Sequence, residues 1–229
     1  MNYTTIFFDG YGTLFDKAFD ALYETCQIIV DDLQIDMSKE AFLDHWDRYF
    51  FPLLREGGFI SFWDAHIIGL EKTFADLHVR ANPESYMTGL FDAFGRVPLF
   101  CDVKSAIDAL SDVKTGVISN ADHGHLILAL SNNDLSFPVV ISSESARCYK
   151  PNPDIFFCAF EALGADPDQT LYVGDSQEDD IVGARRAGIS IAWLNRDGAV
   201  RRDDIPEPDY EISSLSELCD ILEGNNATD

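Results

Sequence analysis

Residues 6–16 read IFFDGYGTLFD, an apolar run that stops at one acidic residue, Asp9, and passes into a segment with two glycines. An apolar run of this length predicts a buried strand, and Gly10 and Gly12 favour a tight turn directly after it. In an open parallel sheet, ligands bind outside the carboxyl ends of the strands. Asp9 is therefore a candidate functional residue if the rest of the chain forms such a sheet.

Four further apolar runs extend the pattern along the chain. Each is continuous rather than alternating, which is typical of strands that are covered on both faces. Helical patterns lie between most of them, and one expected helix begins at Asn152 and Pro153 and ends at Gly164. Alternating strands and helices predict an α/β fold with a doubly wound, Rossmann-like parallel sheet. The four runs are TGVIS, PVVIS, TLYVG and ISIAWL.

Residues 17–97 break this alternation, because they show helical periodicity and no convincing strand. The first strand is thus separated from the second by a long helical insert. We expect a discontinuous catalytic core formed by residues 1–16 and 98–229. Residues 17–97 are expected to form a small all-helical cap domain.

Two helices of this insert have clear boundaries in the sequence. One is expected to begin behind the capping pair Ser61 and Asp64. Another is expected to run from Ser38 to Phe51, because proline disrupts a helix interior and Pro52 is followed closely by two glycines.

The composition limits the classes of partner. The 229 residues carry a net charge of −24, so nucleic acid and anionic membrane surfaces are repelled, and a small anionic substrate needs a local positive feature. The five cysteines form no close pair, which argues against a zinc knuckle or a dithiol site. The sequence shows neither a secretion-signal pattern nor an apolar stretch of membrane-spanning length, so we expect a cytoplasmic protein. The oligomeric state is left open.

Polar residues follow several of the predicted strands. Asp9 ends the first apolar run, Ser119 and Asn120 follow GVI, and Asp175 follows LYVG. Lys150 comes shortly after the run VVIS, within the segment KPNP. These side chains should share one crevice. Two nearby carboxylates repel each other unless a cation or proton lies between them, and oxygen ligands suit Mg²⁺.

This set of groups suits phosphoryl transfer. With Mg²⁺ on Asp9 and Asp175, the Asp9 carboxylate can attack phosphorus and form an aspartyl phosphate that water then hydrolyses. Lys150, Ser119 and Asn120 would hold the oxygens of the transferred group. From the residues alone, the alternative is that these are ordinary capping residues after strands.

Four motifs in this order resemble the haloacid dehalogenase superfamily, and they span the whole core. The resemblance implies that Asp9 is the nucleophile and that Asp175 and the Tyr11 carbonyl join it on Mg²⁺. It also implies that Lys150 and Ser119 bind the transferred group together with Gly10, Tyr11 and Asn120, that Thr13 steadies the turn after the first strand, and that Asp180 supports the metal or its waters. The motifs are Asp9-Gly10-Tyr11-Gly12-Thr13-Leu14, Ser119-Asn120, Lys150-Pro151, and Gly174-Asp175-Ser176 with Asp180.

Tyr11 departs from the phosphatases of this superfamily, which usually carry a second aspartate at that position as acid and base. A phenol with an ordinary pKa near 10 is poorly matched to that task at neutral pH. The pattern Asp-x-Tyr-Gly-Thr is similar to the 2-haloacid dehalogenase branch, in which aspartate displaces a halide that needs no proton. Tyr11 therefore predicts substrates whose leaving groups depart largely unprotonated, such as acyl phosphates or anhydrides, or a proton supplied by the substrate or the cap.

The segment VGDSQEDD favours a metal-dependent phosphatase over a 2-haloacid dehalogenase. By this resemblance, dehalogenases of that branch replace the acidic Gly-Asp-Ser segment with uncharged residues and need no metal. This chain keeps Asp175 and Asp180. The dehalogenase cap supplies an arginine next to a tryptophan, whereas here Trp46 is followed by Asp47, with Arg48 and Arg55 only nearby.

We therefore favour Mg²⁺-dependent hydrolysis of a small phosphorylated metabolite. A metal-independent 2-haloacid dehalogenase with an ester intermediate on Asp9 is the alternative. A non-catalytic binder of a phosphorylated ligand is the third possibility.

Overall fold

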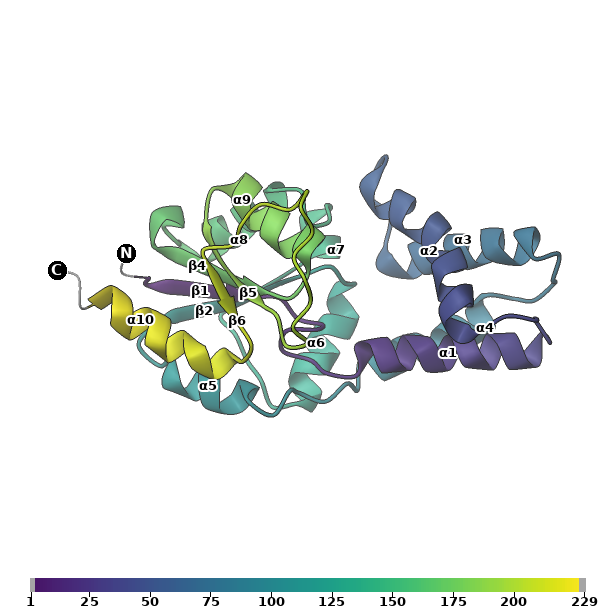
Figure 1. Cartoon of the computed structure of the whole chain (residues 1–229), viewed down its shortest axis with the longest axis horizontal. Coiled ribbons are helices and arrows are strands. Elements are labelled where there is room, and N and C mark those ends of the chain that lie inside the picture. Colours follow the sequence, from purple (N-terminus) through teal and green to yellow (C-terminus); the bar gives the residue numbers. More distant parts are fainter. Residues whose placement is uncertain (1–2, 227–229) are drawn as a thin grey trace.

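The computed structural model describes residues 3–226, and its centre is a six-stranded sheet in the order β3-β2-β1-β4-β5-β6 (Figure 1). All five strand pairs are parallel. The predicted doubly wound α/β fold is therefore confirmed. The strands are β1 Thr5–Phe8, β2 Lys114–Ser119, β3 Val139–Ser142, β4 Thr170–Gly174, β5 Ser190–Leu194 and β6 Tyr210–Ile212.

Both faces of the sheet are covered, as the continuous apolar runs require. Along β1, Ile6 and Phe8 belong to one buried cluster and Phe7 belongs to another, because successive side chains of a strand point to opposite faces. One face packs against α5, α6 and α10, and the other against α8 and α9. These helices are α5 Val103–Ala109, α6 His123–Asn132, α8 Asp154–Leu163, α9 Val182–Ala187 and α10 Leu218–Asn226.

Four helices lie between β1 and α5, and no strand occurs in residues 17–97. Figure 1 shows them gathered beyond the carboxyl ends of the strands, away from both ends of the chain. Their apolar stripes pack on one another and continue the buried cluster of one sheet face. Treatment of this segment as a separate cap domain stays a prediction. The helices are α1 Ala18–Asp32, α2 Lys39–Arg55, α3 Phe62–Asp76 and α4 Glu84–Phe94.

The cap helices begin as the sequence predicts, but one of them ends later. The Ser61 hydroxyl accepts a hydrogen bond from the Asp64 backbone N–H at 3.0 Å, as expected of that capping pair. The expectation that Pro52 ends α2 is wrong, because the helix continues through Pro52 to Arg55. The Pro52 carbonyl accepts a bond from the Glu56 N–H at 2.8 Å, so the last turn is closed although the proline lacks a donor.

Four shorter elements complete the described part of the chain, among them a 3-10 turn (Pro167–Gln169) that precedes β4. The helix α7 (Ser143–Ala146) follows β3 directly, a π-helical turn (Gln177–Ile181) precedes α9, and a short turn precedes α10. No helix in residues 3–226 is long and apolar enough to cross a membrane.

Candidate active site

The carboxyl ends of the central strands bring the predicted polar residues together. Because β1 pairs with β2 on one side and β4 on the other, Asp9, Ser119 and Asp175 lie at one end of three adjacent strands. Lys150, between α7 and α8, and Asp180, in the π-helical turn, reach the same place. We call these five residues the floor of the site.

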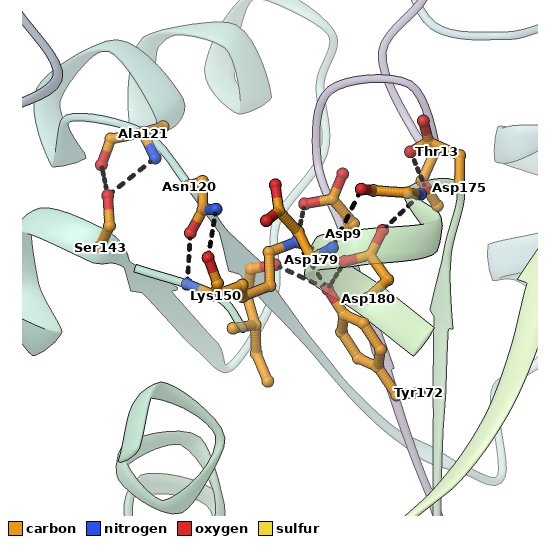
Figure 2. Close-up of polar contacts among 12 residues, drawn as sticks. Asp9, Thr13, Asn120, Ala121, Ser143, Lys150, Tyr172, Asp175, Asp179 and Asp180 are labelled. Carbon is orange, nitrogen blue, oxygen red and sulfur yellow. Dashed lines mark hydrogen bonds and ion pairs between the residues drawn. The ribbon is translucent and has the colours of Figure 1, made fainter. Parts of the chain in front are cut away.

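Lys150 is the centre of the floor, as Figure 2 shows. Its Nζ donates to Asp9 Oδ1 and to Asp180 Oδ1, both at 2.6 Å, and to the Tyr172 hydroxyl at 2.9 Å. All three ammonium hydrogens therefore have acceptors. Burial alone would lower the pKa of Lys150, but the charges of Asp180 and Asp9 outweigh burial and raise that pKa, so the ammonium stays charged.

Tyr172 is a floor contact that sequence reasoning missed. It lies inside β4, where its single O–H has two acceptors within reach, Asp180 Oδ1 at 2.9 Å and the Ile118 carbonyl at 3.2 Å. The only signal in the sequence is a hydroxyl-bearing ring within the otherwise aliphatic run TLYVG. Tyr172 holds Lys150 and Asp180 in place from beneath.

Asp180 is turned back over the end of β4 by the π-helical turn, a kind of local irregularity that often occurs at functional sites. Its second oxygen accepts the Ser176 N–H at 2.8 Å. A Cβ on Gly174 would lie 2.3 Å from the Asp180 Cγ, so only glycine permits this approach. The neighbouring Asp179 lines the cavity, and burial raises its pKa to about 6.

Asp175 faces the turn after β1. The Thr13 hydroxyl donates to its Oδ1 at 3.0 Å, which agrees with the predicted steadying role of Thr13. A Cβ on Gly12, whose φ is +96°, would lie 2.4 Å from Asp175 Oδ2, so this glycine is required by both conformation and space. Burial, with added repulsion from Asp9 and Asp180, raises the pKa of Asp175 well above its ordinary value.

The floor residues fit a hard divalent cation. Asp9, Asp175 and Asp180 each offer an oxygen, and the three oxygens lie within 4.8 Å of one another. One ammonium faces the buried carboxylates of Asp9 and Asp180 and the partly buried carboxylate of Asp175, so the floor carries excess negative charge that a dication would neutralise. An all-oxygen donor set suits Mg²⁺. Burial raises the pKa of Asp9 to about 6 despite the charge of Lys150, so Asp9 is ionised at neutral pH.

Three further residues of the predicted site, Ser119, Gly10 and Asn120, lie near the floor or belong to it. Ser119 is buried and lines the cavity, and the Gly10 carbonyl accepts the N–H groups of Leu14 and Phe15, which closes the turn after β1. Asn120 does something that was not foreseen: its side chain donates to the Lys150 carbonyl at 3.2 Å and accepts the Lys150 N–H at 2.8 Å. Asn120 thereby positions the lysine, and its contact with substrate stays a prediction.

Tyr11 has its side chain directed toward the cap. Its ring packs against Phe15 and Phe94, and its hydroxyl makes a long 3.4 Å bond to the Phe94 carbonyl. Burial and the charge of Asp9 raise the pKa of this phenol far above its ordinary value. Tyr11 is therefore a packing residue at the junction of cap and core, and its hydroxyl is unsuited to acid–base chemistry. The proposed role of its carbonyl on the metal stays a prediction.

A cavity of about 320 Å³ lies over the floor, and helices α1 to α4 provide its other walls. We call the cap residues that line it the roof. Most are aromatic or aliphatic, which is typical of small-molecule sites. The roof residues are Ala18, Phe19, Leu22, Leu43, Asp47, Phe50, Phe51, Leu54, Arg55, Phe62, His66, Phe91 and Phe94.

Two polar roof residues were not identified from the sequence. His66 is 4% exposed and stacks on Phe50 at 4.2 Å between ring centroids, yet neither ring nitrogen has a hydrogen-bond partner. Burial lowers its pKa to about 3, so the imidazole is neutral. Burial, with repulsion from Asp44, raises the pKa of Asp47 to about 6. An unsatisfied buried polar group costs of order 1–3 kcal/mol, so the His66 ring nitrogens are retained at a cost to stability. Asp47 is only partly buried, and its raised pKa shows that folding disfavours its ionised form.

Core and cap are also joined by hydrogen bonds at a point outside the floor. Asp122 follows β2, and its two carboxylate oxygens accept the N–H groups of Phe62 and Trp63 at 2.7 and 2.8 Å. A carboxylate is favourable at the positive end of a helix, so a core residue caps α3. Asp122 does not cap its own helix α6 with this side chain.

The sequence is similar to a known family of hydrolases and to characterised members of it. The sequence model for haloacid dehalogenase-like hydrolases matches residues 6–194. The chain is 28% identical over 202 residues to an (S)-2-haloacid dehalogenase of Xanthobacter autotrophicus, covering 83% of this chain and 74% of that protein. It is 30% identical over 205 residues to the human N-acylneuraminate-9-phosphatase, covering 87% of this chain and 79% of that protein.

Solved structures agree on the architecture. The L-2-haloacid dehalogenase of Xanthobacter autotrophicus superposes with a TM-score of 0.79 at 22% identity, covering 97% of this chain and 99% of that one. At this level of identity the likeness concerns the fold alone. Sequence and structure comparisons therefore lead to one group of hydrolases that contains both dehalogenases and phosphatases.

Proposed function

The chain belongs to the haloacid dehalogenase-like hydrolases, and from this premise we propose that it is a Mg²⁺-dependent phosphatase that acts on a small phosphate ester or anhydride. Relatives of both chemistries are found at similar identity, so the comparisons support a phosphatase and a dehalogenase about equally. The choice rests on one observation at the floor. Asp175 places a third carboxylate oxygen within 4.8 Å of Asp9 and Asp180, where only one ammonium is available to balance them.

Each floor residue has a task in this reaction. Asp9, ionised at neutral pH, attacks phosphorus and becomes an aspartyl phosphate, which water then hydrolyses. Lys150 is held by Asp180, Tyr172 and Asn120, so its charge is already in place to stabilise the transferred oxygens. Bound Mg²⁺ would be held by Asp9 and Asp175 and would supply charge neutralisation for the phosphoryl group.

The packing of Tyr11 bears on the leaving group. Neither Tyr11 nor neutral His66 can deliver a proton at pH 7, so substrates with acidic leaving groups are expected to react fastest. In wild-type protein, an aryl phosphate should therefore be cleaved much faster than a simple alkyl phosphate. Tyr11→Asp should raise the rate for the alkyl ester. Equal wild-type rates, with no gain on substitution, would contradict this explanation.

The dehalogenase remains the second candidate because Arg55 lines the cavity, whereas Arg48 does not. A cationic side chain in the roof is what a 2-haloacid carboxylate would need. Arg55 is exposed, however, and its guanidinium lies 4.9 Å from the Phe51 ring centroid. The roof also contains the partly buried carboxylate of Asp47, which would repel a haloacid.

One assay separates the two. Phosphate release from an aryl phosphate is measured with Mg²⁺ and after chelation, beside halide release from 2-chloropropionate under both conditions. We expect phosphate release that needs Mg²⁺ and no halide release. Halide release that survives chelation, without phosphatase activity, would establish the dehalogenase instead.

A further inference from the structure

The roof contains a carboxylate for which the proposed reaction has no use. Asp47 lies on the same face of α2 as Leu43, Phe50 and Leu54, all of which line the cavity. Their spacing of three or four residues makes one stripe along the helix. A carboxylate in the middle of an apolar stripe is costly unless something compensates its charge.

No group in residues 3–226 compensates it. Asp47 makes no hydrogen bond or ion pair there, and the charged neighbour that acts on it is another acid, Asp44. Arg55, on the same helix, stacks over Phe51 instead. His66 is neutral, so it neither balances Asp47 nor repels a cation. The roof therefore presents an uncompensated negative charge to the cavity.

The walls around Asp47 narrow the kind of cation that fits. A primary ammonium has three donors to satisfy, but the roof around Asp47 offers this carboxylate and one acceptor nitrogen of neutral His66 among aromatic and aliphatic side chains. An alkylated ammonium has few or no donors and is attracted to aromatic faces. The strongly negative net charge of the chain also favours a substrate with a positive end.

We propose that the substrate is a phosphate ester whose leaving group carries an alkylated ammonium, with Lys150 binding the phosphate end and Asp47 the ammonium end. This inference deepens the phosphatase function proposed above and rests on it. Both residues line one cavity of about 320 Å³, Lys150 from the floor and Asp47 from the roof, so a small molecule bound there is offered a positive and a negative group at once. Asp47 is then a specificity-determining residue, and it does not touch the reacting atoms.

The test uses two isosteric esters, 4-(trimethylammoniomethyl)phenyl phosphate and 4-neopentylphenyl phosphate. They differ in the replacement of a charged nitrogen by carbon, and both have aryl leaving groups. The quantity measured is the ratio of their kcat/KM values with Mg²⁺. Because intrinsic reactivity is the same for every protein variant, the change in this ratio between variants reports the charge interaction alone.

Three variants complete the design. Asp47→Asn should lower the preference for the charged ester about tenfold, with little change for the neutral ester. Asp47→Glu keeps the charge and should keep most of the preference. Asp44→Asn removes an exposed acid one turn away that does not line the cavity, so it should leave the ratio almost unchanged. A preference that survives Asp47→Asn, or an equal loss in Asp44→Asn, would overturn the inference.

A binding measurement separates this inference from the phosphatase proposal. Calorimetric titration with the two free phenols, 4-(trimethylammoniomethyl)phenol and 4-neopentylphenol, needs no turnover. If neither ester is hydrolysed but the charged phenol binds more tightly, and Asp47→Asn abolishes the difference, the ammonium site stands and the phosphatase function falls. If both esters are hydrolysed without an Asp47-dependent preference, the phosphatase stands and the ammonium site falls. If neither phenol shows Asp47-dependent binding and neither ester is hydrolysed, both proposals fail.

Discussion

Lys150, Asp9 and Asp180 are hydrogen-bonded to one another and Lys150 and Asp180 to Tyr172, whereas in the roof the Asp47 carboxylate and the His66 ring nitrogens have no hydrogen-bond partner among residues 3–226. The floor is thus built to hold charges in fixed positions, and the roof keeps unsatisfied groups facing a cavity. Buried polar groups without partners cost stability. We infer from this difference that the floor supplies the reaction and that the unpaired roof groups select the substrate.

The largest effect is expected from Asp9→Asn. An amide cannot replace the carboxylate as nucleophile, so turnover should fall by more than about 1,000-fold while the protein stays folded. Phosphate release and circular dichroism are the measurements, with the exposed Asp20→Asn as control. Residual turnover near the wild-type rate would remove Asp9 from the chemistry.

The next effect concerns the excess charge of the floor. Saturating Mg²⁺ should stabilise the protein by about 2–3 kcal/mol at a hundredfold excess over its dissociation constant. Asp175→Asn should not lower the stability of the metal-free protein, because it relieves repulsion among three closely spaced carboxylates. The same variant should lose most of the stabilisation by Mg²⁺. Urea unfolding with and without Mg²⁺ measures both. An unchanged Mg²⁺ effect in the variant would show that the ion binds elsewhere.

Removal of the Asp47 charge from the roof should stabilise the folded protein. Folding raises the pKa of Asp47 to about 6, so ionised Asp47 destabilises the folded protein at pH 7. Asp47→Asn should therefore gain roughly 1–2 kcal/mol at pH 7, after a discount for partial exposure. The gain should shrink as the pH is lowered from 7 toward 4, where Asp47 is protonated in the folded state. Denaturant midpoints across this range test it, and Asp44→Asn should stay within about 0.5 kcal/mol of wild type.

The smallest effect is expected where cap and core meet. Tyr11→Phe removes a long hydrogen bond but keeps the ring packed against Phe15 and Phe94, so stability should change by less than about 1 kcal/mol. Turnover of an aryl phosphate should be nearly unchanged. A large fall in kcat with an altered pH profile would instead make the phenol part of the reaction.

The sheet and the floor could be predicted because both follow from local pattern. Continuous apolar runs mark strands covered on both faces, and in a parallel sheet their ends converge, so Asp9, Ser119 and Asp175 could be brought together without a structure. The strand β6 could not be predicted, because its three residues are too short for any periodicity to appear. The extension of α2 through Pro52 was missed because a proline rule has exceptions that only packing reveals.

The roof was not predictable from the same pattern. A helical stripe shows which residues share a face, but the periodicity does not show whether that face meets another helix or an open cavity. Asp47 and His66 therefore looked like ordinary positions on cap helices. Tyr172 was missed for a related reason, since the hydroxyl of a buried strand residue gains its meaning only from Lys150 and Asp180 across the sheet end.

The carboxylate of Asp122 has a consequence for how the four helices can move. The chain passes between cap and core twice, and the Asp16 N–H donates to the Pro98 carbonyl at 2.8 Å, so these passages lie side by side and act as one pivot. The bonds from Phe62 and Trp63 to Asp122 form a second pivot. Two fixed points define an axis. A swing that keeps both is a rotation about the line joining them, so the cap residues far from that line travel farthest.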